Sequence, residues 1–438
     1  MQLSKHNILT PIRGDRRWLI ANLLSGQADV LEPELGEQLS RGEVVQAEEL
    51  AAKGYLVDPA EELRRYRAAY LDFVESRETD EVQLFYVPSY ACNFACSYCF
   101  QDEYAPPPGD QGEEVLGAFF RYVDDNFADR RKYVTLFGGE PLLPSPAYRR
   151  IVDAIIDGTR DRGLDLAIVT NAYNLASYVP TLTRGLIREI QITLDGPQKI
   201  HDGRRYLKGG GETFGRVVEG VDAALGANLA VNLRTVLDKE NVRAFGELAH
   251  FAIDRGWTKH PKFKTQIGRN YELHHCQADR GKLHSRLSLF EELHALVEAD
   301  PAILEFHQPA FSVAKFLFEH GELPSPLFDS CPACKTEWAF DYTGSIYPCT
   351  ATVGKQGEAL GTFWPEVKLD RSLVEPWEER DVVVMESCAS CPQQLACGGG
   401  CGAVAKNNAG HVHSPDCRPV AELLSLGTSL YGKDALAG

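Results

Sequence analysis

Three cysteines with metal-ligand spacing are the most chemically informative residues of the chain. Cys92, Cys96 and Cys99 form a C-x3-C-x2-C group in "CNFACSYCF". A structural zinc site or a cubane iron–sulfur cluster needs four ligands, but the next cysteine in the chain is Cys276. A metal centre with three protein ligands keeps one position open for a substrate or cofactor. The spacing therefore favours a catalytic centre, and the alternative is a zinc site or a chance grouping.

A second, larger set of cysteines lies near the C-terminus. The segment from 328 to 419 is rich in predicted loops, so it cannot bury much apolar surface and is expected to fold around metal. Pairs of the C-x2-C type would first suggest a zinc ribbon. The eight cysteines are Cys331, Cys334, Cys349, Cys388, Cys391, Cys397, Cys401 and Cys417.

Composition narrows the function classes. The chain has 438 residues, a formal net charge of −17 and twelve cysteines. A surface this acidic repels phosphate backbones, which argues against a nucleic-acid substrate. No segment has the length and apolarity of a signal peptide or a membrane span, so we expect a cytoplasmic protein without a membrane partner. In a reducing compartment, grouped cysteines indicate metal binding or catalysis rather than disulfides.

The middle of the chain alternates between predicted strands and helices. Six strands are expected, and each except the last is followed by a helical pattern, which favours a parallel sheet with right-handed crossovers. Six units predict a partial (β/α)6 barrel of the TIM type, with its active site at the carboxyl ends of the strands. The predicted strands are 82–90, 133–141, 164–172, 187–196, 229–237 and 262–268.

Four domains follow from these patterns. Residues 1–60 combine short strands with two helices and are predicted to form a winged-helix-like module. A linker helix is expected at 61–81, the barrel at 82–300, and a loop-rich domain with metal sites at 301–438.

The first cysteine group resembles that of the radical S-adenosylmethionine (SAM) superfamily. The resemblance rests on the C-x3-C-x2-C motif after the first barrel strand and on an aromatic residue, Tyr98, just before Cys99. The resemblance implies that Cys92, Cys96 and Cys99 hold a [4Fe-4S] cluster whose open iron binds SAM. An electron from the cluster would cleave SAM to methionine and a 5′-deoxyadenosyl radical, which abstracts a hydrogen atom.

Further motifs at strand ends resemble the cofactor contacts of that superfamily. "GGEP" at 138–141 would hold the amino group of SAM. "TLDGP" at 193–197 has threonine where the family commonly has serine, and "HDGRR" at 201–205 supplies Arg205 for the carboxylate of SAM. For Asn171, Asp195 and Arg205, strand-end caps and loop ion pairs are the alternative roles. The implied cofactor-binding residues are Tyr98, Gly138, Gly139, Glu140, Pro141, Asn171, Thr193, Asp195 and Arg205.

The C-terminal cysteines resemble a SPASM domain, which binds two auxiliary [4Fe-4S] clusters, making three clusters in all. The resemblance implies one set of ligands at Cys331, Cys334, Cys349 and Cys401, and another at Cys388, Cys391, Cys397 and Cys417. Zinc is the alternative for both sets. Cys276 belongs to neither ligand set. It is either a buried or incidental thiol or a catalytic one.

SPASM enzymes act mainly on peptides and proteins, so the resemblance implies a maturase of a ribosomally made precursor peptide. The N-terminal module would bind the leader of that peptide as an added strand, and a flavodoxin or ferredoxin would supply electrons. The expected product is a thioether, ether or carbon–carbon crosslink. Alternatives are an epimerase, with Cys276 as hydrogen donor, or a sulfatase-type formylglycine maturase. A non-catalytic iron–sulfur electron carrier or a zinc-stabilised peptide-binding protein is the alternative from another class.

Overall fold

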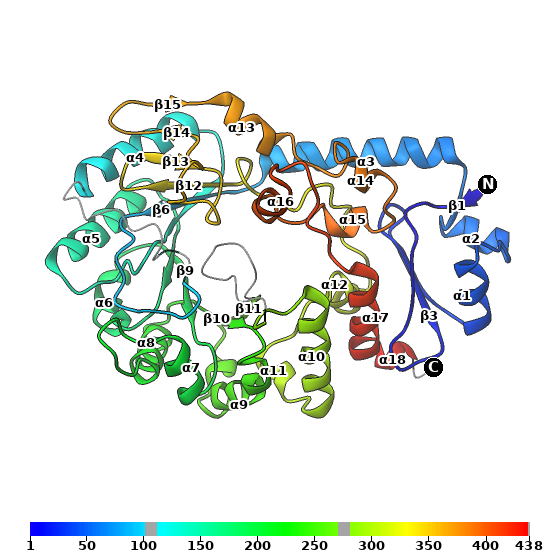
Figure 1. The fold of residues 1–438 in the computed structure, drawn as a ribbon, viewed down its shortest axis with the longest axis horizontal. Coiled ribbons are helices and arrows are strands. Elements are labelled where there is room, and N and C mark those ends of the chain that lie inside the picture. The colour runs from blue at the N-terminus through cyan, green and yellow to red at the C-terminus, as the bar shows by residue number, and fades with distance from the viewer. Residues whose placement is uncertain (100, 102–111, 270–280, 437–438) are drawn as a thin grey trace.

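The computed structural model describes residues 1–99, 101, 112–269 and 281–436. Its central feature is a run of six parallel strands, which confirms the predicted partial barrel (Figure 1). Every neighbouring pair in this run is parallel, in the order β11-β10-β9-β8-β7-β6. The strands are β6 (Val82–Val87), β7 (Lys132–Leu136), β8 (Leu166–Thr170), β9 (Ile187–Thr193), β10 (Val231–Leu237) and β11 (Phe263–Arg269).

Helices cover the outer face of these strands. In α4, Val115, Phe119 and Tyr122 recur at helical spacing and are buried, because this face packs on the sheet. The crossover elements are α4 (Gly112–Asn126), α5 (Pro146–Arg160), α6 (Leu175–Leu182), α7 (Gln198–Arg204), α8 (Phe214–Gly226), η2 (Val242–Ala244), α9 (Phe245–Asp254) and η3 (Trp257–Lys259).

The C-terminal region extends the barrel sheet beyond its first strand. β12 (Glu337–Asp341) pairs in parallel with β6, from Glu337 opposite Gln83 to Asp341 opposite Val87. β13 (Ser345–Tyr347), β14 (Gly361–Thr362) and β15 (Lys368–Leu369) follow in antiparallel pairs, giving a sheet of ten strands. The pairing covers the backbone edge of β6, which would otherwise be open.

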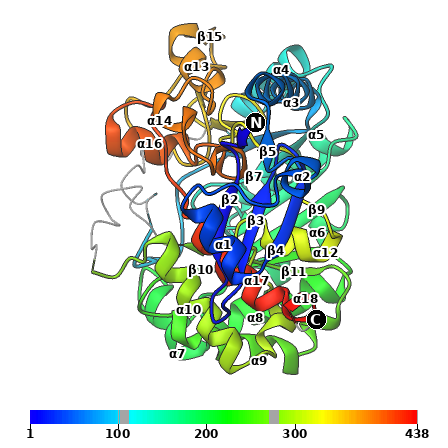
Figure 2. The same ribbon diagram turned by 90° about the vertical axis from the view of Figure 1, so that its right-hand side faces the viewer.

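The N-terminal module has its own small sheet and core (Figure 2). β2 (Ile8–Pro11), β3 (Trp18–Asn22) and β4 (Gln27–Leu31) form an antiparallel meander, and β1 (Gln2–Leu3) pairs with β5 (Leu56–Val57). Helices α1 (Pro33–Ser40) and α2 (Ala47–Ala52) follow β4. Ile20, Leu39, Leu50, Tyr55 and Leu56 are buried together as the core of this module.

A long helix joins this module to the rest of the chain. α3 (Pro59–Thr79) begins at Asp58, whose carboxylate accepts hydrogen bonds from two backbone N–H groups of the first turn. Its aromatic face packs around Phe328 through Tyr66, Tyr70 and Phe73. The Tyr66 hydroxyl also donates a hydrogen bond to Gln394 over 2.9 Å, so α3 is fixed to the cysteine-rich region.

Among the remaining helices, α11 packs on α9 and α10 on η2 at the end of the barrel, and α17 packs on β2 and β3 of the N-terminal sheet (Figure 1). Across the described ranges, no helix has the length and apolarity needed to cross a membrane. These helices are α10 (Arg286–Ala299), α11 (Ile303–Phe306), α12 (Ala314–His320), α13 (Arg371–Glu378), α14 (Glu386–Ala389), α15 (Gln394–Cys397), α16 (Gly402–Ala409), α17 (Val420–Tyr431) and α18 (Lys433–Leu436).

Candidate active site

A cavity of about 350 Å³ opens inside the barrel and at the carboxyl ends of its strands. All three cysteines of the first group line it, together with inward-facing residues of β6 to β10. Thr350 and Ala351 of the C-terminal region complete the wall. The cavity therefore lies where such folds place their active sites, and the residue after Cys349 forms part of it.

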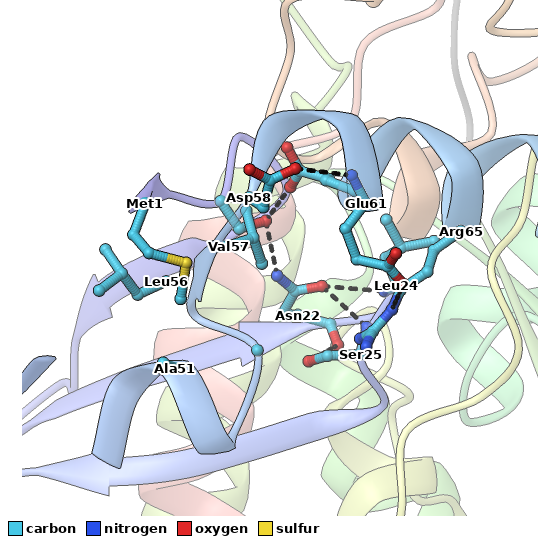
Figure 3. A pocket seen from close by; sticks show the side chains of 13 residues that line it. Met1, Asn22, Leu24, Ser25, Ala51, Leu56, Val57, Asp58, Glu61 and Arg65 are labelled. Carbon is cyan, nitrogen blue, oxygen red and sulfur yellow. Dashed lines mark hydrogen bonds and ion pairs between the residues drawn. The ribbon is translucent and has the colours of Figure 1, made fainter. Parts of the chain in front are cut away.

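Another cavity, of about 200 Å³, lies in the N-terminal module (Figure 3). Asn22, Ser25 and Arg65 line it with the acidic residues Asp58 and Glu61. None of the residues that the sequence marks as cofactor or metal ligands lies in this cavity. The chemistry therefore belongs to the barrel cavity.

The first cysteine group brings three thiols to one wall of the barrel cavity. Burial, followed by the charges of Glu140, Cys96 and Cys99, raises the pKa of Cys92 to about 12. Three thiolates this close repel one another, and a bound cation would remove that cost. The Cys92 sulfur already accepts hydrogen bonds from the Phe94 N–H (3.4 Å) and from the Asn171 side chain (3.8 Å).

The cysteine loop is held by the segment that follows β9. The backbone N–H of Ala95 donates to the Tyr206 carbonyl (2.8 Å), and that of Ser97 donates to the Arg204 carbonyl (2.9 Å). Phe94 also forms an isolated bridge with Leu207. The "HDGRR" segment therefore supports the cysteine loop through its backbone, a role that the sequence analysis did not foresee.

The two glycines after β7 let a second loop approach the cysteine loop closely. Gly138 has φ +134°, which favours glycine, and a Cβ on Gly139 would lie 2.3 Å from the Ala91 carbonyl oxygen. The Glu140 N–H donates a hydrogen bond of 2.9 Å to the same carbonyl. The absence of side chains here thus allows backbone contact with the loop that presents Cys92.

Glu140 lies behind the cavity wall rather than on its surface. It is 1% exposed, and its carboxylate accepts hydrogen bonds from Leu142 N–H (2.8 Å), the Thr170 hydroxyl (2.7 Å) and Asn171 N–H (2.6 Å). Burial raises its pKa, and these hydrogen bonds oppose that rise. In this position Glu140 joins β7 to β8 and orients Asn171, whose side chain reaches Cys92.

Asp195 is likewise buried, at 0% exposure, and its carboxylate contacts neighbouring polar side chains. Its carboxylate accepts a 2.5 Å hydrogen bond from the Tyr98 hydroxyl and lies 3.5 Å from Arg204. Arg205 donates to the same Tyr98 hydroxyl over 2.8 Å. Arg204 forms a buried ion pair with Asp238, with 2.9 Å to each carboxylate oxygen. The network fixes Tyr98 between a carboxylate and a guanidinium.

Residues 86–252, which include this network and the cysteine loop, match the family model of the radical SAM superfamily. The chain carries a radical SAM domain. A GTP 3′,8-cyclase of Campylobacter fetus subsp. fetus is 30% identical over 166 residues, which cover 38% of this chain and 50% of that protein. The serine-type anaerobic sulfatase-maturating enzyme of Bacteroides thetaiotaomicron is 28% identical over 137 residues, or 30% and 33% of the two chains. The chain thus spans half or less of these relatives.

Two solved structures share the fold over a larger part of the chain. anSMEcpe with bound AdoMet and a peptide has a TM-score of 0.61 at 17% identity, covering 82% of this chain and 100% of that one. Streptococcus suis SuiB bound to its precursor peptide SuiA has a TM-score of 0.56 at 15% identity, covering 96% and 99%. The likeness to SuiB therefore extends beyond the radical SAM domain.

The predicted cofactor residues of the radical SAM domain fall into two groups. The structure places Tyr98, Gly138, Gly139, Asn171, Thr193 and Arg205 on the cavity wall. It buries Glu140, Pro141 and Asp195 outside the lining, where the carboxylates of Glu140 and Asp195 position neighbouring groups by hydrogen bonds. Sequence reasoning missed Arg204, although the arginine doublet in "HDGRR" was a usable signal. Cys276 lies outside the described residues.

Four C-terminal cysteines come together beside the radical SAM domain. The charges of Cys331 and Cys401 raise the pKa of Cys349, after the larger effects of burial and Glu337. Cys334 interacts with Cys331 in the same way. Cys401 is thus close to Cys349 and Cys331, although it follows a different C-x2-C pair in the sequence. These are the four cysteines of the first implied ligand set, and their binding of a cluster stays a prediction.

The other four C-terminal cysteines form a separate group. Burial, followed by the charges of Cys397, Cys391 and Cys417, raises the pKa of Cys388 to about 11. Cys417 interacts with Cys397 and Cys391 as well. These are the members of the second implied ligand set. Within the described ranges, no three His, Cys, Asp or Glu side chains are arranged to hold a metal ion as they stand, so cluster binding stays a prediction.

Arg418 lies near both groups. Its charge interacts with Cys397 of one set and Cys401 of the other, and its Nε is buried without a hydrogen-bond partner. Burial and the nearby Arg286 lower its pKa. A guanidinium near thiols whose Nε has no partner among the described residues fits a site that carries negative charge when loaded, as an iron–sulfur cluster with four thiolates does.

Replacing Gly139 by alanine should disrupt the contact between the two loops. The new Cβ would lie 2.3 Å from the Ala91 oxygen and 2.4 Å from the Tyr90 oxygen, and both are backbone atoms that cannot move independently. We expect SAM affinity to fall at least about tenfold, with a loss of about 1–3 kcal/mol in the free energy of unfolding. Calorimetric titration with SAM and thermal denaturation measure the two effects.

Gly226→Ala is the matched control, because a Cβ at Gly226 would meet no atom within 4 Å. Its SAM affinity should equal that of the wild type. Equal affinity in Gly139→Ala would show that the close approach of the loops is not needed to form the cofactor site.

Proposed function

We propose that this chain is a radical SAM maturase that modifies a ribosomally made precursor peptide. The observation that carries the proposal is the extent of the shared fold. The likeness to SuiB, solved with its precursor peptide, covers 96% of this chain, whereas the likeness to anSMEcpe covers 82%. The wider coverage supports the proposal that the N-terminal module of this chain binds a leader peptide.

The cofactor proposal rests on three thiols that face the barrel cavity. Cys92, Cys96 and Cys99 would hold a [4Fe-4S] cluster, and SAM would occupy the adjoining cavity. When bound, the reduced cluster and SAM supply a 5′-deoxyadenosyl radical that abstracts a hydrogen atom from the substrate. Arg205 fits this site, since its buried Nε lacks a hydrogen-bond partner and its charge interacts with Cys96.

The residues of the chain would bind and orient the reactants. Asn171 connects the Cys92 sulfur to the Glu140 carboxylate through its side chain and its backbone N–H. Phe85 and Phe137 give the cavity apolar walls, which exclude water from a reactive carbon centre. The eight C-terminal cysteines would hold two auxiliary [4Fe-4S] clusters, which would supply an acceptor for the surplus electron of a crosslinking reaction.

The N-terminal module would bind the leader at a sheet edge. In the order β2-β3-β4, α17 packs on β2 and β3, so β4 offers the more open edge for an added strand. A flavodoxin or ferredoxin would reduce the first cluster. We place the reaction in the cytoplasm, where the thiols stay reduced.

Among possible products, we favour a thioether, ether or carbon–carbon crosslink over an epimer or a formylglycine. The barrel cavity favours an enzyme over an electron carrier or a zinc-stabilised peptide-binding protein, because those proteins need no substrate space.

The decisive experiment uses the protein after anaerobic cluster reconstitution, with SAM, dithionite and the peptide encoded beside its gene. We expect 5′-deoxyadenosine and a peptide that has lost two hydrogen atoms by mass spectrometry. An unchanged mass with an inverted residue would indicate epimerisation, and Cys276→Ala would then abolish it. If no 5′-deoxyadenosine forms above a sample without protein, the enzyme proposal is wrong.

A further inference from the structure

The barrel cavity is positively charged in an acidic protein. The chain has a formal net charge of −17, yet the charged residues that line the cavity, among those described, are three arginines and one glutamate. The glutamate, Glu189, is already paired with Lys264 at 2.5 Å. Such a lining attracts negatively charged groups. The three arginines are Arg205, Arg234 and Arg269.

Two of these arginines already have partners. Arg205 donates to the Tyr98 hydroxyl and lies near the Cys96 thiol. Arg269 donates a 2.8 Å hydrogen bond to the His284 carbonyl. Arg234 differs from both, because its side chain has no hydrogen bond or ion pair with any residue that the structure describes, and its Nε is buried.

The neighbouring strand leaves room for the Arg234 guanidinium. Arg234 lies in the middle of β10, beside Thr193 of β9 and Gln266 of β11 in the register. A Cβ on Gly268 of β11 would lie 2.8 Å from its Nε and 2.9 Å from one terminal nitrogen. Any larger residue at 268 would displace the guanidinium, so the position of the charge depends on this glycine.

We propose that Arg234 binds a carboxylate of the peptide substrate, either an Asp or Glu side chain or the C-terminal carboxylate. This inference rests on the proposed function for the nature of the substrate. A guanidinium with a buried, unpaired N–H is costly, and a carboxylate satisfies it with two parallel hydrogen bonds. A single unpaired arginine suits one carboxylate, whereas a nucleoside triphosphate would need several cations.

Three small probes separate the two sources of carboxylate. Nα-acetyl-glutamate methylamide has only a side-chain carboxylate, Nα-acetyl-glutamine has only a terminal one, and Nα-acetyl-glutamine methylamide has neither. Saturation-transfer NMR titrations of the reconstituted protein with SAM would measure their binding. We expect at least one charged probe to bind more tightly than the neutral one. Arg234→Gln should weaken that probe about tenfold or more.

Two further variants keep the test independent of folding and of turnover. Gly268→Ala should weaken the same probe because its Cβ displaces the guanidinium, although the arginine itself is retained. Arg150→Gln, which changes an exposed arginine on α5, should not weaken it. Retained SAM affinity shows that each variant is folded. Equal binding of charged and neutral probes, or no loss in Arg234→Gln, would overturn the inference. So would GTP binding that depends on Arg234 and displaces the probes. Because no turnover is measured, failure of the maturase assay is a separate result.

Discussion

Cys92→Ala should reduce the formation of 5′-deoxyadenosine by more than about a hundredfold. Cys92 is one of three thiols on the cavity wall, and it receives the hydrogen bonds from Phe94 and Asn171. Without it, two thiolates would remain for a cluster that needs at least three protein ligands to keep a single open iron. Changes to residues that only support metal ligands already cost ten- to a hundredfold in affinity or activity, so loss of a ligand should cost more.

The measurement is chromatographic quantification of 5′-deoxyadenosine after anaerobic reconstitution with SAM and dithionite. Iron content should fall by the share of one cluster, because the C-terminal cysteines are unchanged. Ser97→Ala is the matched control in the same loop. Ser97 is exposed, and its structural contact is the hydrogen bond from its backbone N–H to Arg204, which alanine keeps. Equal product from Cys92→Ala and Ser97→Ala would exclude the first cysteine group as the site of SAM cleavage.

The order of strands in the barrel could be predicted because each strand leaves a local pattern. Short apolar runs alternate with helical spacing from 82 to 268, and glycine and polar residues follow each run. No local sequence pattern predicts the position of β12 beside β6 in the sheet. Glu337–Asp341 lies in a segment for which the sequence predicted mainly loops, and its pairing with β6 depends on contacts between segments far apart in the sequence. Long-range pairing of this kind is set by tertiary packing.

The residue types of the candidate site could be predicted from the sequence, but the orientation of several of their side chains relative to the cavity could not. The motifs around Glu140 and Asp195 mark the correct loops, but both carboxylates are buried outside the cavity lining. Glu140 accepts a hydrogen bond from Thr170 of β8, and Asp195 accepts from Tyr98 of the cysteine loop and from Val236 of β10. Burial makes this necessary, since a carboxylate without donors would be strongly destabilising there. Arg234 was missed for the opposite reason, because a single arginine inside a strand matches no motif.

Arg380→Met should unfold the region that holds the C-terminal cysteines. Arg380 is fully buried, and it donates to the carbonyls of Val412 (2.8 Å) and Gly399 (2.6 Å) and to the carboxylate of Asp329 (3.2 Å). Methionine fills a similar volume but donates no hydrogen bond, so the Val412 carbonyl loses this donor. The Gly399 carbonyl is left with the Asp416 N–H, and Asp329 with the Cys331 N–H and Lys335. Removing one partner of a buried ion pair typically costs about 3–5 kcal/mol.

The loss should appear as a change in cluster content as well as in stability. The segments that Arg380 joins include Asp329, two residues before Cys331, and Gly399, two residues before Cys401. We therefore expect lower iron content and a lower unfolding temperature, with the Cys92 group still able to bind iron. Arg371→Met is the control, since its ion pairs with Glu378 and Glu375 are exposed and contribute at most about 1 kcal/mol. If Arg380→Met kept the iron content and unfolding temperature of Arg371→Met, the folding of the cysteine-rich region would not depend on this buried guanidinium.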